Sequence, residues 1–274
     1  MSKALVASPL GFLIGFSMGA LGGGGSVLAV PILVYIVGQS PPAATTTSLV
    51  VVGLAALVGM GDHWRAGRVR PGIGVVFGVA GLGGSIAGSA LNRHLDPNVL
   101  LLAFAALVLV AAWRMLAGCP SCTNAGEDRA LVKGGNPEGS VRVVAGLRVD
   151  AATIAKVLVA GTLVGFFTGL FGVGGGFIIV PALTLLLGFA MPEAIGTSLL
   201  IIAINAAIAL GARLGTDTVD WSVTALFTLA ALAGVLAGSR TADRLPARSM
   251  LRSFAALLVA VGAYTAARSV VSLT

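Results

Sequence analysis

Charged residues are scarce in this sequence. Asp, Glu, Lys and Arg make up 10% of its 274 residues, against about 25% in soluble domains. With 57% hydrophobic residues and a mean hydropathy of +1.02, the chain could not present a surface wetted by water alone. Several continuous apolar runs approach the roughly 20 residues that cross a bilayer, which predicts an all-α polytopic membrane protein. A β-barrel is disfavoured because these runs do not alternate with period two.

Residues that carry chemistry are scarce as well. Cys119 and Cys122 form a C-x-x-C pair, but a zinc site needs a second pair of ligands, so we expect no metal. The sequence shows no Ser/His/Asp set and no phosphate-binding loop, so we expect no catalytic residue and no cofactor. The net charge of +7 lies in short loops, where basic residues set membrane orientation and do not indicate nucleic-acid binding.

No charged residue lies deep within an apolar run. Lys156, Glu193 and Arg213 lie near the ends of such runs. Buried carboxylates usually mark proton or cation coupling. Their lack disfavours a cation carrier and a proton pump, whereas a neutral site lined by hydroxyl and amide groups suits an anion.

An internal repeat relates the two halves of the chain. A shift of 150 residues, without any gap, places "GFSMGALGGGGSVLAVPIL" (15–33) on "GFFTGLFGVGGGFIIVPAL" (165–183). We therefore expect a first transmembrane repeat at 1–117, a linker at 118–150 and a second transmembrane repeat at 151–274. The five apolar segments of each half lie near 5–21, 25–38, 43–61, 71–91 and 98–117, and near 151–171, 175–188, 193–212, 221–239 and 249–270.

Loop charges predict that the two repeats face opposite ways. Each half crosses the membrane an odd number of times, whether its short second segment spans or re-enters. The loops 62–70 and 240–252 carry seven arginines, whereas their repeat partners carry only Arg213 and Arg93. By the positive-inside rule, both loops and the linker face the cytoplasm. This pattern predicts two inverted-topology repeats of about five helical segments each.

Two glycine clusters, 22–26 and 172–176, lie inside apolar surroundings. Glycine weakens helices, so we expect broken or re-entrant helices at these clusters. A helix that begins inside a membrane exposes unpaired N–H groups and a partial positive charge, which together bind anions. Close helix packing through small residues is the alternative. The candidate substrate-binding residues are Gly23, Gly24, Gly25, Ser26, Gly174, Gly175 and Gly176.

Hydroxyl and amide side chains form a second set of candidates. Thr47 and Ser48 recur in the second half as Thr197 and Ser198, near the start of a segment. They either point toward substrate or bond to their own helix backbone. Asn205 lies well inside a segment, where it either binds substrate or makes an interhelical hydrogen bond.

With these residues in view, the chain resembles the sulfite exporter TauE/SafE family of membrane transporters. The resemblance rests on the paired motifs at 15–33 and 165–183, followed by "TTTSL" and "GTSLLIIAINA". It covers nearly the whole chain except the linker. It implies a secondary transporter, with export favoured, for sulfite or a related small organosulfur anion across the bacterial plasma membrane. Proton-coupled uptake and a non-transporting assembly protein are the alternatives. The expected partners are the small anion and the lipid bilayer, without nucleic acid, and a homo-oligomer is compatible with the sequence.

Overall fold

The predicted helical segments are all present in the computed structural model. It describes residues 2–92, 94, 97–117, 142–144, 147–149, 151–171, 176–213, 221–242 and 246–273. Nearly all of these residues are helical, which confirms the all-α polytopic class. Within the predicted linker, two short strands, β1 (Arg142–Val144) and β2 (Leu147–Val149), pair antiparallel with Val143 opposite Arg148. Cys119 and Cys122 lie outside the described residues.

Ten α-helices and one 3-10 helix are described. Three of the α-helices begin at a proline, where the fixed φ suits a first helical turn and the missing N–H removes no bond. The helices are α1 (Ser2–Leu21), η1 (Gly22–Gly25), α2 (Ser26–Tyr35), α3 (Pro41–Arg65), α4 (Pro71–Asn92), α5 (Pro97–Ala117), α7 (Ala151–Phe171), α8 (Gly176–Leu185), α9 (Met191–Arg213), α10 (Trp221–Ala242) and α11 (Ala247–Leu273).

Six described helical stretches are long and apolar enough to cross a membrane. This finding supports a multi-pass membrane protein. The stretches are 8–34, 43–65, 71–92, 154–171, 191–211 and 223–242.

The chain reverses direction at the first glycine cluster. Gly22 has a φ of +72°, a left-handed conformation that glycine adopts without strain. A Cβ placed on Gly25 would lie 2.5 Å from the carbonyl oxygen of Ile14. In a straight helix these two residues would be about 16 Å apart along the axis. The stretch 8–34 is therefore a helical hairpin in which α2 returns beside α1, and the helix break predicted at this cluster is present.

Two parallel helix pairs join the halves of the chain. In one pair Gly15 of α1 faces Ala231 of α10, and in the other Gly165 of α7 faces Gly81 of α4. One turn further along, Gly19 faces Val235 and Gly169 faces Ser85. The residue numbers increase in the same direction in both helices of each pair, so the helices are parallel. The contacts of one pair reproduce those of the other after the 150-residue shift. The missing side chains let the backbones approach closely, as small residues do between membrane helices.

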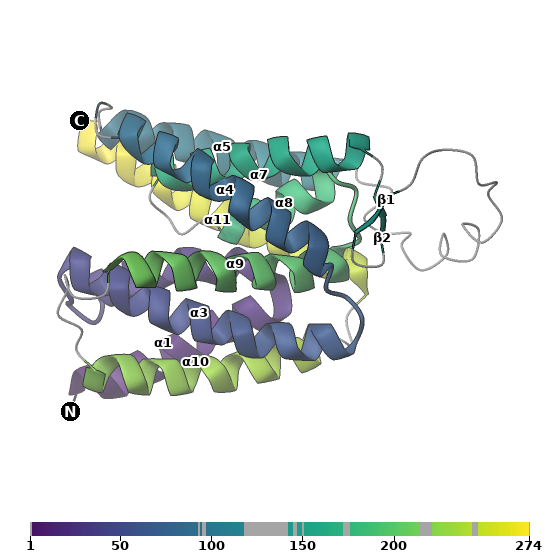
Figure 1. Ribbon diagram of the computed structural model, residues 1–274. Coiled ribbons are helices and arrows are strands. Elements are labelled where there is room, and N and C mark those ends of the chain that lie inside the picture. Colours follow the sequence, from purple (N-terminus) through teal and green to yellow (C-terminus); the bar gives the residue numbers. More distant parts are fainter. Residues whose placement is uncertain are drawn as a thin grey trace.

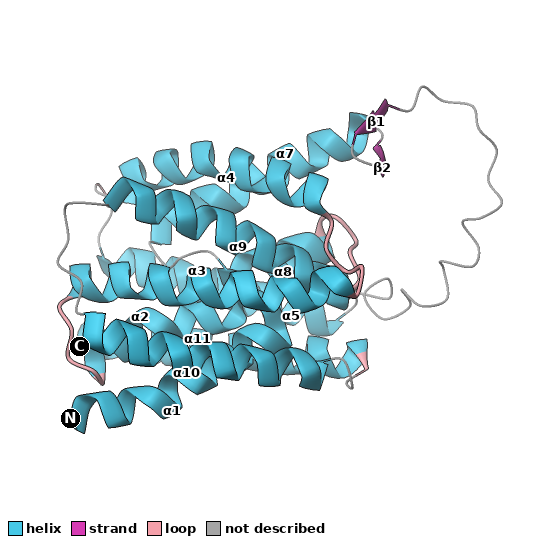
Figure 2. Cartoon of the chain, turned by 60° about the horizontal axis from the view of Figure 1, so that its bottom comes forward, coloured by secondary structure: helices cyan, strands magenta, loops and turns pink. Residues whose placement is uncertain are grey.

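The remaining helices are arranged around these pairs (Figures 1 and 2). Helix α3 packs against α9, α5 packs against α11, and the α1–α10 and α4–α7 pairs flank α3 and α9 respectively. Both termini lie at one end of the molecule, which we call the termini end, and the strands lie at the other, the linker end (Figure 1). The ends of α3 and α10, which lead into the loops predicted to be cytoplasmic, lie together at the linker end (Figure 1), where the Ser239 hydroxyl donates to the Asp62 carboxylate.

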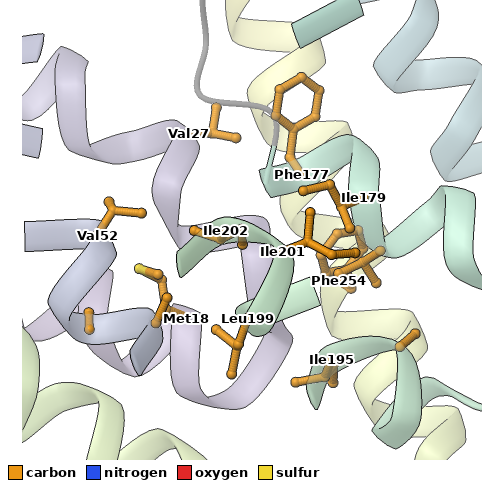
Figure 3. Packing of buried hydrophobic residues seen from close by; sticks show 14 of the residues in the cluster. Met18, Val27, Val52, Phe177, Ile179, Ile195, Leu199, Ile201, Ile202 and Phe254 are labelled. Carbon is orange, nitrogen blue, oxygen red and sulfur yellow. The ribbon is translucent and has the colours of Figure 1, made fainter. Parts of the chain in front are cut away.

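The apolar core continues across the centre of the molecule (Figure 3). Phe254 of α11 is fully buried, and Phe177 of α8 stacks edge-on against Phe104 of α5 with ring centroids 5.1 Å apart. The core thus packs the short helix α8 against the longer helices around it.

The close approach of α4 and α7 predicts a matched pair of variants. A Cβ on Gly84 would overlap the backbone of Thr162, whereas a Cβ on Gly83 would meet nothing within 4 Å. We expect Gly84→Ala to lower the unfolding free energy by about 1–3 kcal/mol, the usual cost of overpacking. Gly83→Ala should be neutral or slightly stabilising. Thermal unfolding in detergent measures both, and equal midpoints would contradict the glycine-mediated packing.

Candidate functional site

A cavity of about 580 Å³ lies between the α4–α7 pair and the central helices α3 and α9. Most of its wall is formed by the start of α3 and by the second halves of α4, α7 and α9, all of which lie toward the termini end (Figure 1). Helix α2 contributes the buried residues Ser26 and Val27 to the wall. The polar side chains on the wall include Ser26, Thr45, Ser48, Ser85, Thr168 and Asn205.

The described wall of the cavity is electrically neutral. Every described residue that lines it is apolar, glycine, serine, threonine or asparagine. Ser26 and Val27, at its buried side, are the first two residues of α2. The N-terminus of a helix carries about half a positive elementary charge, so α2 directs a favourable dipole toward an anion in the cavity.

Three of the predicted site residues line this cavity: Ser26, Ser48 and Asn205. The Ser26 hydroxyl donates to the carbonyl oxygen of Gly23 at 2.7 Å, which ties α2 to the glycine turn. The Asn205 Oδ1 atom is buried and has no hydrogen-bond partner among the described residues. The interhelical hydrogen bond that was the alternative for Asn205 is therefore not made by this atom.

The four predicted glycines that the structure describes contact protein and are not among the residues that line the cavity. Gly23 lies against Gly176, and a Cβ there would overlap the Gly176 backbone. A Cβ on Gly24 would meet the side chains of Phe254 and Leu257 at 3.1 Å, and Gly25 lies against α1. These contacts correspond to the close-packing alternative. Anion binding by the described glycines remains a prediction, and Gly174 and Gly175 lie outside the described residues.

The predicted hydroxyls are engaged within the protein. Ser48 donates to the carbonyl oxygen of Thr45 at 2.9 Å, and Ser198 donates to that of Ile195 at 2.8 Å. Thr47 lies 3.3 Å from Thr224 between their hydroxyl oxygens. Both serines therefore bond to backbone carbonyls of their own helices, which was the alternative to a role in substrate binding.

Four polar residues of the wall were not among the predicted sites: Thr45, Ser85, Ser89 and Thr168. Ser89 recurs as Ser239, whereas the shift partners of the other three are apolar: Ile195, Val235 and Met18 respectively. A search for residues that recur in both halves passes over such positions. The signal that could have found them is the opposite one, a polar residue in one half opposite an apolar residue in the other.

The region equivalent to the cavity in the other half is filled. Met18, Ile195 and Val235 each have 0% exposure and belong to the buried core cluster. Figure 3 shows Met18 and Ile195 among the packed side chains. The shift partner of Asn205 is Ala55, which is also fully buried. Among the described residues, the polar cavity therefore lies on one side of the α3–α9 pair, and these equivalent residues on the other side are buried in the core.

The linker end is joined by polar contacts between the halves. Arg70 forms an ion pair with Glu193 at 2.9 Å, and its backbone N–H donates to the Thr197 hydroxyl at 3.2 Å. The Ser239 hydroxyl donates to the Asp62 carboxylate at 2.7 Å. We call these contacts the linker-end clasp. Thr197 therefore belongs to the linker-end clasp and not to the cavity wall.

Comparisons with known proteins cover both halves of the chain. The model of a family described as Sulfite exporter TauE/SafE matches residues 7–265. A "Probable membrane transporter protein" from Xylella fastidiosa (strain 9a5c) is 34% identical over 276 residues, which cover 100% of this chain and 98% of that protein. The "Probable membrane transporter protein YdhB" of Bacillus subtilis (strain 168) is 22% identical over 238 residues, covering 86% and 89%. No solved structure gives a significant match.

Proposed function

The chain belongs to the TauE/SafE family of membrane transporters, and we propose that it is a secondary transporter that exports sulfite or a related small organosulfur anion across the bacterial plasma membrane. The observation that carries this proposal is the neutral, polar cavity on one side of the α3–α9 pair, with its counterpart on the other side filled. No chemical step is assigned to the protein, because transport alone accounts for such a cavity.

Alternating access explains why only one of the two equivalent regions is open. In transporters built from inverted repeats, one set of helices rocks against the other around a central site. Here the α4–α7 and α1–α10 pairs are each held together by glycines and flank the central helices. We assign the rocking motion to these two pairs. Movement of α4–α7 toward α9 would close the cavity, while movement of α1–α10 away from α3 would open its counterpart toward the linker end.

The membrane potential sets the direction of transport. One elementary charge gains about 2.3 kcal/mol per 100 mV when it moves with the potential. Because the cell interior is negative, an anion leaves downhill without a coupling ion. Uptake of the same anion would require a co-transported proton or cation. Export is therefore the direction that a cavity with uncharged described walls favours.

Flux through reconstituted protein tests the proposed function. Proteoliposomes loaded with labelled sulfite or labelled sulfonate should release it faster when the potential is positive on the receiving side. Accumulation driven by a pH gradient would select proton-coupled uptake instead. If no organosulfur anion crosses in either direction while the protein is folded, the substrate assignment is wrong and the assembly-protein alternative gains weight.

The linker-end clasp predicts a measurable shift between states. Arg70 and Glu193 are 33% and 19% exposed, and partly exposed ion pairs contribute about 0.2–1 kcal/mol. Arg70→Glu should therefore favour the state open at the linker end by up to about fivefold. The readout is the reactivity of a cysteine at Ser89, near the termini end, with an impermeant thiol reagent after Cys119 and Cys122 are replaced by serine.

The charge-swapped variant is the control for this measurement. Arg70→Glu combined with Glu193→Arg restores opposite charges at the same two positions and should restore the original reactivity. Unchanged reactivity in Arg70→Glu alone would show that the clasp does not hold the linker end closed.

A further inference from the structure

We propose that the cavity is selective for anion charge: it binds one singly charged anion and discriminates against doubly charged anions of similar size. This inference rests on the proposed function and adds a rule for its substrates. It follows from the donors that the cavity offers, from the helix ends that meet beside it and from the neutrality of its described wall.

Most hydroxyls on the wall are committed to the protein backbone. The Ser26 hydroxyl donates to Gly23, and that of Ser48 donates to Thr45. The Thr168 hydroxyl donates to Val164 at 2.7 Å, and that of Ser89 donates to Gly169 at 3.4 Å. In the described part of the chain, these hydrogens are therefore not available to an anion unless the backbone bonds are given up.

Two neutral side chains remain as donors. The structure records no hydrogen bond for the Ser85 hydroxyl within the described residues. The Asn205 side chain lies on the wall with a buried, unpartnered Oδ1 on the side of Gly78. An amide oxygen only accepts hydrogen bonds, so an anion in the cavity would bind the Nδ2 group of Asn205, which donates.

Two helix N-termini meet beside the buried part of the cavity. Helix α2 begins at Ser26 and α8 begins at Gly176, and a Cβ on Gly176 would touch the Ser26 hydroxyl. Each terminus carries about +0.5 elementary charge, so together they present about one positive charge. Ile179, in the first turn of α8, also lines the cavity. The charge that the fold offers is thus of the order of one unit.

A second negative charge would meet no matching group on the described wall. The cost of removing an ion from water rises steeply with its charge, and unpaired buried charges cost several kcal/mol. Dipoles and neutral donors stabilise an anion only in proportion to its charge. A doubly charged anion therefore loses more in desolvation than it regains. We expect at least about a tenfold preference for the singly charged anion.

Competition in the flux assay tests this selectivity. Methanesulfonate and sulfate are tetrahedral anions of similar size that carry one and two negative charges. At matched ionic strength, methanesulfonate should inhibit the efflux of labelled sulfonate at a concentration at least tenfold lower than sulfate. If labelled sulfonate crosses but sulfate competes equally well, the charge selectivity is wrong while the proposed function stands. If no labelled anion crosses, both fail.

A charge introduced on the wall gives a second, independent measurement. Ser85→Lys adds a cation to the partly buried wall of the cavity and should raise the potency of sulfate as an inhibitor by about tenfold relative to methanesulfonate. Ser85→Gln is the matched neutral control of similar length and should keep the original preference. If Ser85→Lys folds and transports but leaves the ratio unchanged, the wall does not set charge selectivity.

Discussion

Alanine at Gly23 is expected to abolish the accumulation of folded protein, whereas alanine at Gly24 is expected to leave most of it folded. A Cβ at position 23 would overlap the backbone carbonyl of Gly176, and neither backbone has room to shift because Gly23 is buried in η1 and Gly176 is the buried first residue of α8. A Cβ at position 24 would meet only the flexible side chains of Phe254 and Leu257, which can shift by a few tenths of an ångström. Size-exclusion chromatography in detergent and thermal unfolding measure the difference.

The comparison separates two roles for the glycine cluster. If the glycines serve as an anion cradle alone, both variants should fold and lose substrate to a similar extent. If they serve close packing, the two neighbours should differ sharply in stability. Folded, transporting Gly23→Ala protein would show that the contact between the two halves is looser than the structure describes, and the assignment of this glycine to packing would be wrong.

Hydropathy and glycine content predicted the helices well for a physical reason. Backbone polar groups in hydrocarbon must be satisfied within the chain, so long apolar runs form helices with little freedom to do otherwise. The predicted segment 71–91 corresponds to α4 (Pro71–Asn92), and the segment 151–171 corresponds to α7 (Ala151–Phe171). The glycine cluster at 22–25 marked the break because glycine is the residue that adopts the φ of +72° found at Gly22.

The binding cavity was harder to predict because it depends on differences between the halves. Thr47 and Thr197 were predicted as site residues because they occupy equivalent positions in the two halves. In the structure, however, both hydroxyls contact other protein groups. Only tertiary packing decides whether a hydroxyl faces a hollow, a backbone carbonyl or another helix. Ser85 and Thr168 line the cavity because the packing of α4 and α7 against α3 and α9 leaves a hollow near the termini end.

A variant that makes the two halves alike should abolish transport without unfolding the protein. The triple substitution Thr45→Ile, Ser85→Val and Thr168→Met gives the cavity wall the residues found at the equivalent positions of the other half. Those apolar residues are fully buried where they occur naturally, so the same side chains have a known way to pack. We expect flux of labelled sulfonate to fall to the level of protein-free liposomes, with the thermal midpoint unchanged or raised.

The reciprocal substitution is the matched control for this prediction. Ile195→Thr, Val235→Ser and Met18→Thr place hydroxyls in the filled region, where each buried group without a partner costs about 1–3 kcal/mol. This variant should lose stability and gain no second pathway, because the surrounding helices are already in contact. Undiminished flux in the first variant would show that substrate does not pass through the cavity. Loss of flux in the first variant with retained folding would mean that transport requires the open, polar cavity, since the substitution removes three of its hydroxyls and fills part of its volume.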